Sequence, residues 1–119
     1  RIRCADGNPM QYVVAYVPCS VCPRITKKDL ESSLYALIAD ASGSRPAKAV
    51  EVYEAINLDA REARALDMST GVAALRTLRT TYDAHGKPFE ASVIISRADR
   101  NRFQVTLDTS GTTFSKVTS

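Results

Sequence analysis

The chain has 119 residues, a formal net charge of +3 and a sequence pI near 8.9. Its hydrophobic fraction of 45% and charged fraction of 24% are ordinary for one globular domain. No apolar stretch approaches the roughly 20 residues of a membrane-spanning helix, and the charged first residues are unlike a secretory signal. Basic residues are interleaved with acidic ones and tryptophan is absent, so the composition does not indicate nucleic-acid binding by this part alone.

The first predicted elements are two strands joined by a tight turn. The run 9–17 is rich in valine and tyrosine, which favour strands. Asp6 and Gly7 precede it, and this dipeptide is typical of two-residue hairpin turns. We therefore expect residues 1–5 to form the end of a partner strand.

A loop and a helix are predicted next. Prolines interrupt residues 18–25, which favours a loop. Thr26 and Asp29 fit a capping pair at a helix start. Apolar side chains then recur at helical spacing, which predicts a helix from about 27 to 40. The residues of this apolar face are Leu30, Leu34, Leu37 and Ile38.

The middle of the chain predicts a strand and a second helix. Residues 46–57 alternate well enough for a strand. Asp59 and Glu62 are spaced as an N-cap and its reciprocal partner, so a short helix is expected over 60–68.

The last part of the chain predicts three strands joined by short turns. These strands cover about 72–82, 87–97 and 103–108, and residues 83–86 form a hairpin loop. Residues 109–119 are rich in serine, threonine and glycine, and we expect a frayed tail. Because short turns join antiparallel neighbours, the order predicts an α+β fold with helices on one side of an antiparallel sheet.

The cysteines and the single histidine offer alternative functions. Cys19 and Cys22 form a C-x-x-C pair, which is typical of redox sites and, with Cys4 and His85, could supply zinc ligands. Prolines flank the pair, and His85 lies at a predicted loop tip. We therefore expect ordinary thiols, no metal and no cofactor. An odd cysteine count favours a reducing compartment, so a cytoplasmic location is expected.

Three charged residues are candidates for ligand binding. Arg1 and Arg3 alternate on one strand and so share a face. Two guanidinium groups there either clamp a phosphate or carboxylate or simply face solvent. Glu90 interrupts an apolar run and shares its face with Ser92 and Ser96. Spacing alone leaves a pocket and a solvated face open for Glu90.

Several motifs together resemble a known domain. They are the strand motif R-I-R-C-A-D-G-N-P-M, the helix motif L-E-S-S-L-Y-A-L-I, the D-x-x-G-x-P-x-E hairpin and the R-x-D-R turn. This combination is similar to the UTRA domain, the effector-binding domain of the HutC subfamily of GntR transcription regulators. The similarity extends from Arg1 to about Leu107. It implies a chorismate lyase-like fold, in which an antiparallel sheet and flanking helices enclose a ligand pocket.

The resemblance also implies a domain organisation and a function. Residues 1–108 would form the effector-binding domain without its first strand, and residues 109–119 a C-terminal tail. A winged helix-turn-helix domain would precede Arg1 and bind operator DNA within a homodimer. The ligand would be a small anionic metabolite, such as a sugar phosphate, carboxylate or phosphonate, that modulates operator binding. We expect no enzyme activity, and the alternative is a chorismate lyase-type enzyme on the same fold.

Ligand-binding roles follow from the resemblance residue by residue. Arg1 and Arg3 match the family's R-x-R pair, which holds the anion. Ser33 matches a serine at the start of a helix, and Glu90 matches the glutamate of the hairpin motif.

Two further ligand positions depart from the family pattern. Val13 stands where sugar-phosphate binders often carry glutamate, and Ser96 stands where they carry tyrosine. Both family residues help to hold the sugar. Their replacement implies a ligand that is smaller than an amino-sugar phosphate or less rich in hydroxyl groups.

Overall fold

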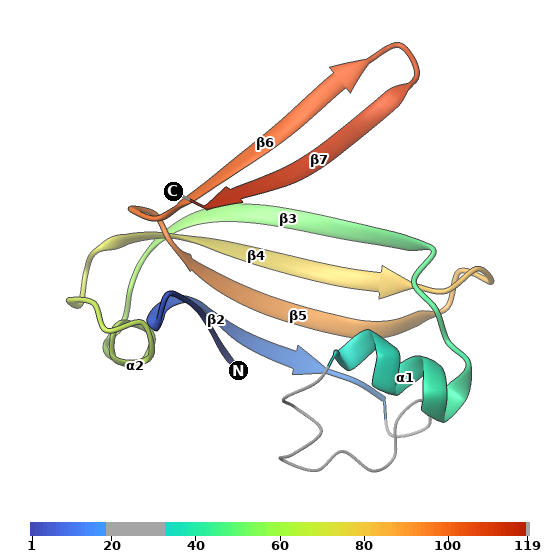
Figure 1. Ribbon diagram of the computed structural model, residues 1–119, viewed down its shortest axis with the longest axis horizontal. Coiled ribbons are helices and arrows are strands. Elements are labelled where there is room, and N and C mark those ends of the chain that lie inside the picture. The colour runs from blue at the N-terminus through green and yellow to red at the C-terminus, as the bar shows by residue number, and fades with distance from the viewer. Residues whose placement is uncertain (19–32, 119) are drawn as a thin grey trace. The chain divides into compact units, whose positions relative to one another are not determined.

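The computed structural model describes residues 1–18 and 33–118 (Figure 1). Its elements are Ile2–Ala5 (β1), Asn8–Tyr16 (β2), Leu34–Ser42 (α1), Lys48–Asn57 (β3), Ala60–Ala65 (α2), Ala73–Tyr82 (β4), Pro88–Arg97 (β5), Asn101–Asp108 (β6) and Gly111–Thr118 (β7). Five strands form an antiparallel sheet in the order β1-β2-β5-β4-β3, and β6 pairs with β7 in a second sheet. The predicted α+β class is confirmed.

The hairpin of β1 and β2 forms as the sequence predicts. Asp6 has a φ of 51° and Gly7 a φ of 78°. Two positive φ values in succession give the mirror-image turn whose twist matches that of paired strands. The antiparallel register places Ile2 opposite Tyr12 and Arg3 opposite Gln11, with an irregularity after Arg3.

Helix α1 begins later than the predicted helix over 27–40. Ser33 has a φ of −67° and a ψ of 122°, which is extended backbone, and its side chain accepts a hydrogen bond from the backbone N–H three residues on. Ser33 is therefore the N-cap of α1, at the start of the helix as the resemblance implies, although the predicted range had the helix begin before it. The predicted cap at Thr26 lies outside the described residues. Gly43, with a φ of 74°, ends the helix.

The chain divides into two compact units, which are described separately. The first comprises residues 1, 13–54 and 77–94, and the second comprises residues 2–12, 55–76 and 95–119.

The core of the first unit lies between α1 and β5. Ile38 is fully buried and Phe89 is 1% exposed, and the partly buried Val17, Leu34 and Tyr35 pack against them. The Tyr35 and Phe89 rings meet edge to face, with centroids 6.3 Å apart and an angle of 68°. The predicted apolar face of the helix is therefore confirmed for Leu34 and Ile38, while Leu30 lies outside the described residues.

The loop between β4 and β5 is a tight, hydrogen-bonded turn. The carboxylate of Asp83 accepts backbone bonds from Lys87 at 3.0 Å and His85 at 2.9 Å, and the Lys87 bond is the main reason that the pKa of Asp83 is lowered. Gly86 has a φ of 77°, a conformation that favours glycine. The predicted loop is confirmed, and His85 is exposed within it.

The second unit contains α2 and its own core. Asp59 and Glu62 form the predicted capping box: each carboxylate accepts the backbone N–H of the other residue, at 2.8 and 2.9 Å. This fixes the first turn of a helix that is otherwise short. The buried apolar residues of this unit are Met10, Leu58, Ala63, Leu66, Ala74 and Ile95.

The C-terminal stretch corrects one expectation. Residues 109–119 contain β7, which pairs with β6 from Asp108–Gly111 to Asn101–Thr118, so the predicted frayed tail is wrong. Threonine and valine in this stretch favour strands. The turn is closed locally because the Asp108 carboxylate accepts hydrogen bonds from the backbone and hydroxyl of Ser110.

Candidate functional site

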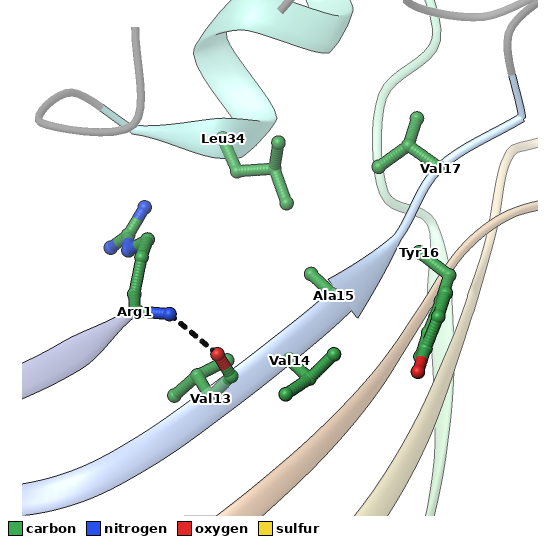
Figure 2. Close-up of a pocket in the computed structure, with 7 residues that line it drawn as sticks. All are labelled: Arg1, Val13, Val14, Ala15, Tyr16, Val17 and Leu34. Atoms are coloured by element: carbon green, nitrogen blue, oxygen red, sulfur yellow. Dashed lines mark hydrogen bonds between the residues drawn. The ribbon is translucent and has the colours of Figure 1, made fainter. Parts of the chain in front are cut away.

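A cavity of about 500 Å³ lies in the first unit, between the end of β2 and the start of α1 (Figure 2). Figure 2 shows Ala15 and Leu34 pointing into the space beside Arg1, while the Tyr16 ring points away from it. The volume is within the range of small-molecule pockets. The described residues that line it are Arg1, Val13, Val14, Ala15, Tyr16, Val17 and Leu34.

Arg1 is held at this cavity by its backbone. The amino nitrogen of Arg1 donates to the carbonyl of Val13 at 2.7 Å, and the Val13 N–H donates to the carbonyl of Arg1 at 2.7 Å. Two residues that exchange both bonds are a directly opposed antiparallel pair, so their side chains share one face. Val13 is 7% exposed and lines the same cavity, which places two of the sequence-predicted ligand residues together.

The start of α1 forms another side of the cavity. Leu34, the first residue of α1, lines the cavity. Ser33, which is exposed, is not among the described residues that line it. The Ser33 side chain accepts the N–H of Ala36 at 3.4 Å. The first N–H groups of a helix lack intrahelical partners and carry a partial positive charge, which favours anions nearby.

A second cavity of about 400 Å³ lies beside the first and shares Tyr16 and Val17 with it. Glu90 lines this second cavity rather than the first, so Arg1 and Glu90 are on neighbouring cavities. The described lining residues are Tyr16, Val17, Pro18, Thr80, Pro88, Glu90 and Ala91.

Glu90 is the centre of a buried hydrogen-bond network. It is 4% exposed, which contradicts the solvated-face alternative. Its Oε2 accepts from the Thr81 hydroxyl at 2.7 Å and from the Tyr35 hydroxyl at 3.2 Å, and its Oε1 accepts from the Ser92 hydroxyl. The Tyr35 and Thr81 oxygens are themselves 3.1 Å apart. These donors compensate for the burial of a carboxylate.

The first unit also contains an ion pair between the neighbouring strands β3 and β4. Arg79 contacts Oε1 of Glu51 through Nε and Nη2, both at 2.6 Å. Burial opposes the charge on Arg79, but the contacts with Glu51 and Tyr35 prevail and raise its pKa. Glu51 also accepts a hydrogen bond from Tyr53. One helix residue, Tyr35, is therefore linked to β4 and β5 at once.

The remaining predicted site residues, Arg3 and Ser96, lie in the second unit. Arg3 is exposed and stands opposite Gln11 in the β1–β2 register. Gln11 is 3% exposed and donates from Nε2 to the Ser96 hydroxyl at 2.8 Å. Ser96 is fully buried, and this bond pairs two buried polar side chains with each other.

Sequence reasoning missed Tyr35, Thr81 and Gln11. Tyr35 lies three residues before Ile38, so helical spacing could have placed it on the packed face. Nothing comparable identifies Thr81 or Gln11, because their partners lie on other strands and the pairing depends on register.

The cysteine alternatives gain no support in the described part of the chain. Within it, no group of three or more histidine, cysteine or acidic residues could hold a metal ion. Cys4 is exposed. Cys19 and Cys22 lie outside the described residues.

Comparisons with known proteins identify the family. The UTRA domain matches residues 1–102. The HTH-type transcriptional regulator Rv0792c of Mycobacterium tuberculosis is 35% identical over 112 residues, which are 90% of this chain and 41% of that protein. A GntR-family transcriptional regulator from Enterococcus faecalis has a TM-score of 0.76 and 27% identity, covering 90% of this chain and 76% of its own. The effector domain of PhnF from Mycobacterium smegmatis has a TM-score of 0.70 and 23% identity, covering 80% and 59%.

The chain belongs to the UTRA domain family and is an effector-binding domain of the GntR class of transcription regulators. Its fold is chorismate lyase-like, as expected. The family is non-enzymatic, so the alternative of a chorismate lyase-type enzyme is set aside. The chain spans about two fifths of the length of the curated relative. Neither helix in the described part is long and apolar enough to cross a membrane.

Proposed function

We propose that this domain binds a small anionic metabolite and that binding modulates operator affinity through a winged helix-turn-helix domain in the full protein. The observation that carries the proposal is the joint position of Arg1 and Leu34 on one cavity. Arginine stays charged at any physiological pH and matches carboxylate and phosphate oxygens with two parallel bonds. The start of α1 adds the partial positive charge of a helix N-terminus.

The other predicted ligand residues take assigned roles within this proposal. Arg3 provides a second guanidinium for the anion, and Ser33 provides a hydroxyl at the helix start. Glu90 shapes its own surroundings in the first unit through the hydrogen bond that it accepts from Thr81, and Ser96, in the second unit, is proposed as a ligand position on the resemblance alone. These assignments rest on the family resemblance.

Modulation requires a ligand that binds one conformation more tightly than another. Helix α1 is the element best suited to respond, because its first residue lines the cavity and the next, Tyr35, bonds to Glu90. A ligand that draws Leu34 toward Arg1 would favour one position of this helix. That shift in population would then reach the DNA-binding domain.

A thermal-shift screen of carboxylates, phosphates and phosphonates tests the binding. A ligand at 100 times its Kd adds about 2.7 kcal/mol of stability. The stabilisation should be lost in Arg1→Gln. Arg61→Gln is a matched control, because it removes the same charge from an exposed position on α2. Equal stabilisation of both variants would contradict the proposal.

We also propose that the full protein acts as a homodimer, as the resemblance implies. Light scattering on the chain should give twice the monomer mass at high concentration. In the full protein, an effector found in the screen should change operator affinity, and Arg1→Gln should abolish that change while leaving operator binding itself intact. A strict monomer would contradict the proposed homodimer. An Arg1→Gln protein that still responds normally to the effector would contradict the proposed role of Arg1.

A further inference from the structure

The walls of the first cavity carry information about the ligand beyond its charge. Apart from Arg1 and Tyr16, whose ring and hydroxyl point away from the space (Figure 2), the described lining side chains are aliphatic. Ala15 and Leu34 point into the space beside the guanidinium (Figure 2). The hydroxyl groups of Thr81 and Ser92 and the Glu90 carboxylate are not among the described lining residues of this cavity, and they bond to one another. Among the described residues, the Glu90 network is thus separate from the apolar walls of this cavity.

These walls discriminate between classes of anion. A sugar phosphate brings several hydroxyl groups, and each needs a hydrogen-bond partner when it leaves water. Aliphatic side chains cannot provide one. An apolar body, by contrast, gains free energy in proportion to the surface that it buries.

We propose that the ligand is an organic acid with one anionic head, held by Arg1, and a compact aliphatic or aromatic body that lies against Val13, Ala15 and Leu34. The inference rests on the proposed function, because it presumes that an anion binds at Arg1. The volume of about 500 Å³ equals roughly 17 water volumes. That space accommodates a branched-chain or aromatic acid and leaves room for a larger apolar body.

Isothermal titration of the chain with a graded series tests the inference. The probes are acetate, isobutyrate, 4-methylpentanoate and phenylacetate, together with inorganic phosphate and glucose 6-phosphate. Affinity should rise about four-fold for each methylene buried, so 4-methylpentanoate should bind at least about 50-fold more tightly than acetate. Glucose 6-phosphate should bind no more tightly than inorganic phosphate.

Substitutions distinguish the contribution of the apolar body of the ligand to affinity from that of its anionic head. Leu34→Ser should reduce the gain in affinity per methylene, and Leu107→Ser is the matched control that should preserve it, because Leu107 is 74% exposed on β6. Leu34 also packs in the core, so Ala15→Ser, at an exposed residue, provides a second variant that keeps the fold. Arg1→Gln should weaken every anion alike.

The outcomes distinguish the two proposals. If anions bind in an Arg1-dependent manner but affinity does not rise with apolar size, or glucose 6-phosphate binds more tightly than the acids, the inference about the body is wrong and the proposed function stands. If neither the acids nor the phosphates bind, both are wrong. The inference is supported if the gain in affinity per methylene is preserved in Leu107→Ser and is reduced in both Leu34→Ser and Ala15→Ser.

Discussion

The buried Glu90 network allows a quantitative prediction for two hydroxyl deletions. Thr81→Val removes the donor at 2.7 Å, and Tyr35→Phe removes the donor at 3.2 Å, and both act on Oε2. Valine has nearly the shape of threonine, and phenylalanine keeps the edge-to-face contact of Tyr35 with Phe89. Each substitution therefore tests a hydrogen bond with little change in packing.

The expected losses follow from the geometry. Hydrogen bonds to a charged group contribute about 1.5–3 kcal/mol each. Thr81 is 1% exposed and its bond is short, so Thr81→Val should cost about 2 kcal/mol. The Tyr35 bond is long, so Tyr35→Phe should cost about 1 kcal/mol. A chain of this size loses about 4 °C in Tm per kcal/mol, which predicts shifts of about 8 and 4 °C.

The double variant Tyr35→Phe/Thr81→Val should lose more free energy of unfolding than the sum of the two single variants. Each hydroxyl still serves Oε2 when the other is deleted, but the double variant leaves this oxygen without either donor in a residue that is 4% exposed. Coupling between residues that share a partner is typically about 0.5–3 kcal/mol. Urea unfolding followed by far-UV circular dichroism measures it, since the chain has no tryptophan to report by fluorescence.

A hydroxyl deletion at an exposed ring is the control. Tyr16 is 63% exposed, and Tyr16→Phe should change stability by less than about 0.5 kcal/mol. If Thr81→Val costs no more than Tyr16→Phe, the Thr81 hydroxyl does not hold the Glu90 carboxylate in place; if the double variant is strictly additive, the two hydroxyl groups act independently on it.

Two further predictions concern the second unit. Asp59→Ala breaks the capping box of α2 and should lower the free energy of unfolding by about 1 kcal/mol in urea titrations, whereas an unchanged midpoint would show that the cap is dispensable. The hydrogen bond from Arg97 lowers the pKa of Asp99, so the ionised carboxylate stabilises the fold above the ordinary pKa near 3.8, and this contribution is lost as the pH falls through the lower folded value. Asp99→Asn should therefore reduce the loss of stability between pH 4 and 2. Identical acid profiles for the two proteins would contradict this.

Local signals predicted most of the fold. Asp6-Gly7, the Asp59–Glu62 cap and the loop at 83–86 each depend on residues close in sequence, and each forms as predicted. The start of α1 shows where such reasoning fails: the capping pattern and apolar spacing predict a helix from about residue 27, whereas α1 begins at Leu34 with Ser33 as its cap. The stretch after Asp108 fails for another reason, because composition suggested a tail where pairing with β6 makes a strand.

The candidate site was less predictable than the fold. Arg1 and Val13 meet at one cavity because they form a hydrogen-bonded pair across β1 and β2, and the turn between them fixes that register. Glu90 has one partner, Thr81, across the β4–β5 hairpin and another, Tyr35 on α1, that lies far away in sequence. The spacing of Glu90 in the sequence is compatible with both a solvent-facing and a buried side chain. The structure shows that it is buried among hydroxyl donors.

Leu34 and Tyr35 connect binding to stability through one turn of α1. Adjacent helix residues point in different directions, so Leu34 can line the cavity while Tyr35 reaches Glu90. A ligand that displaces Leu34 must therefore strain or relieve the bond of Tyr35. The free energy available from such a bond, about 1–3 kcal/mol, is of the size of typical coupling between an effector site and a second site. Under the proposed function, the bond between Tyr35 and Glu90 therefore has the strength needed to couple ligand binding at Leu34 to the position of α1.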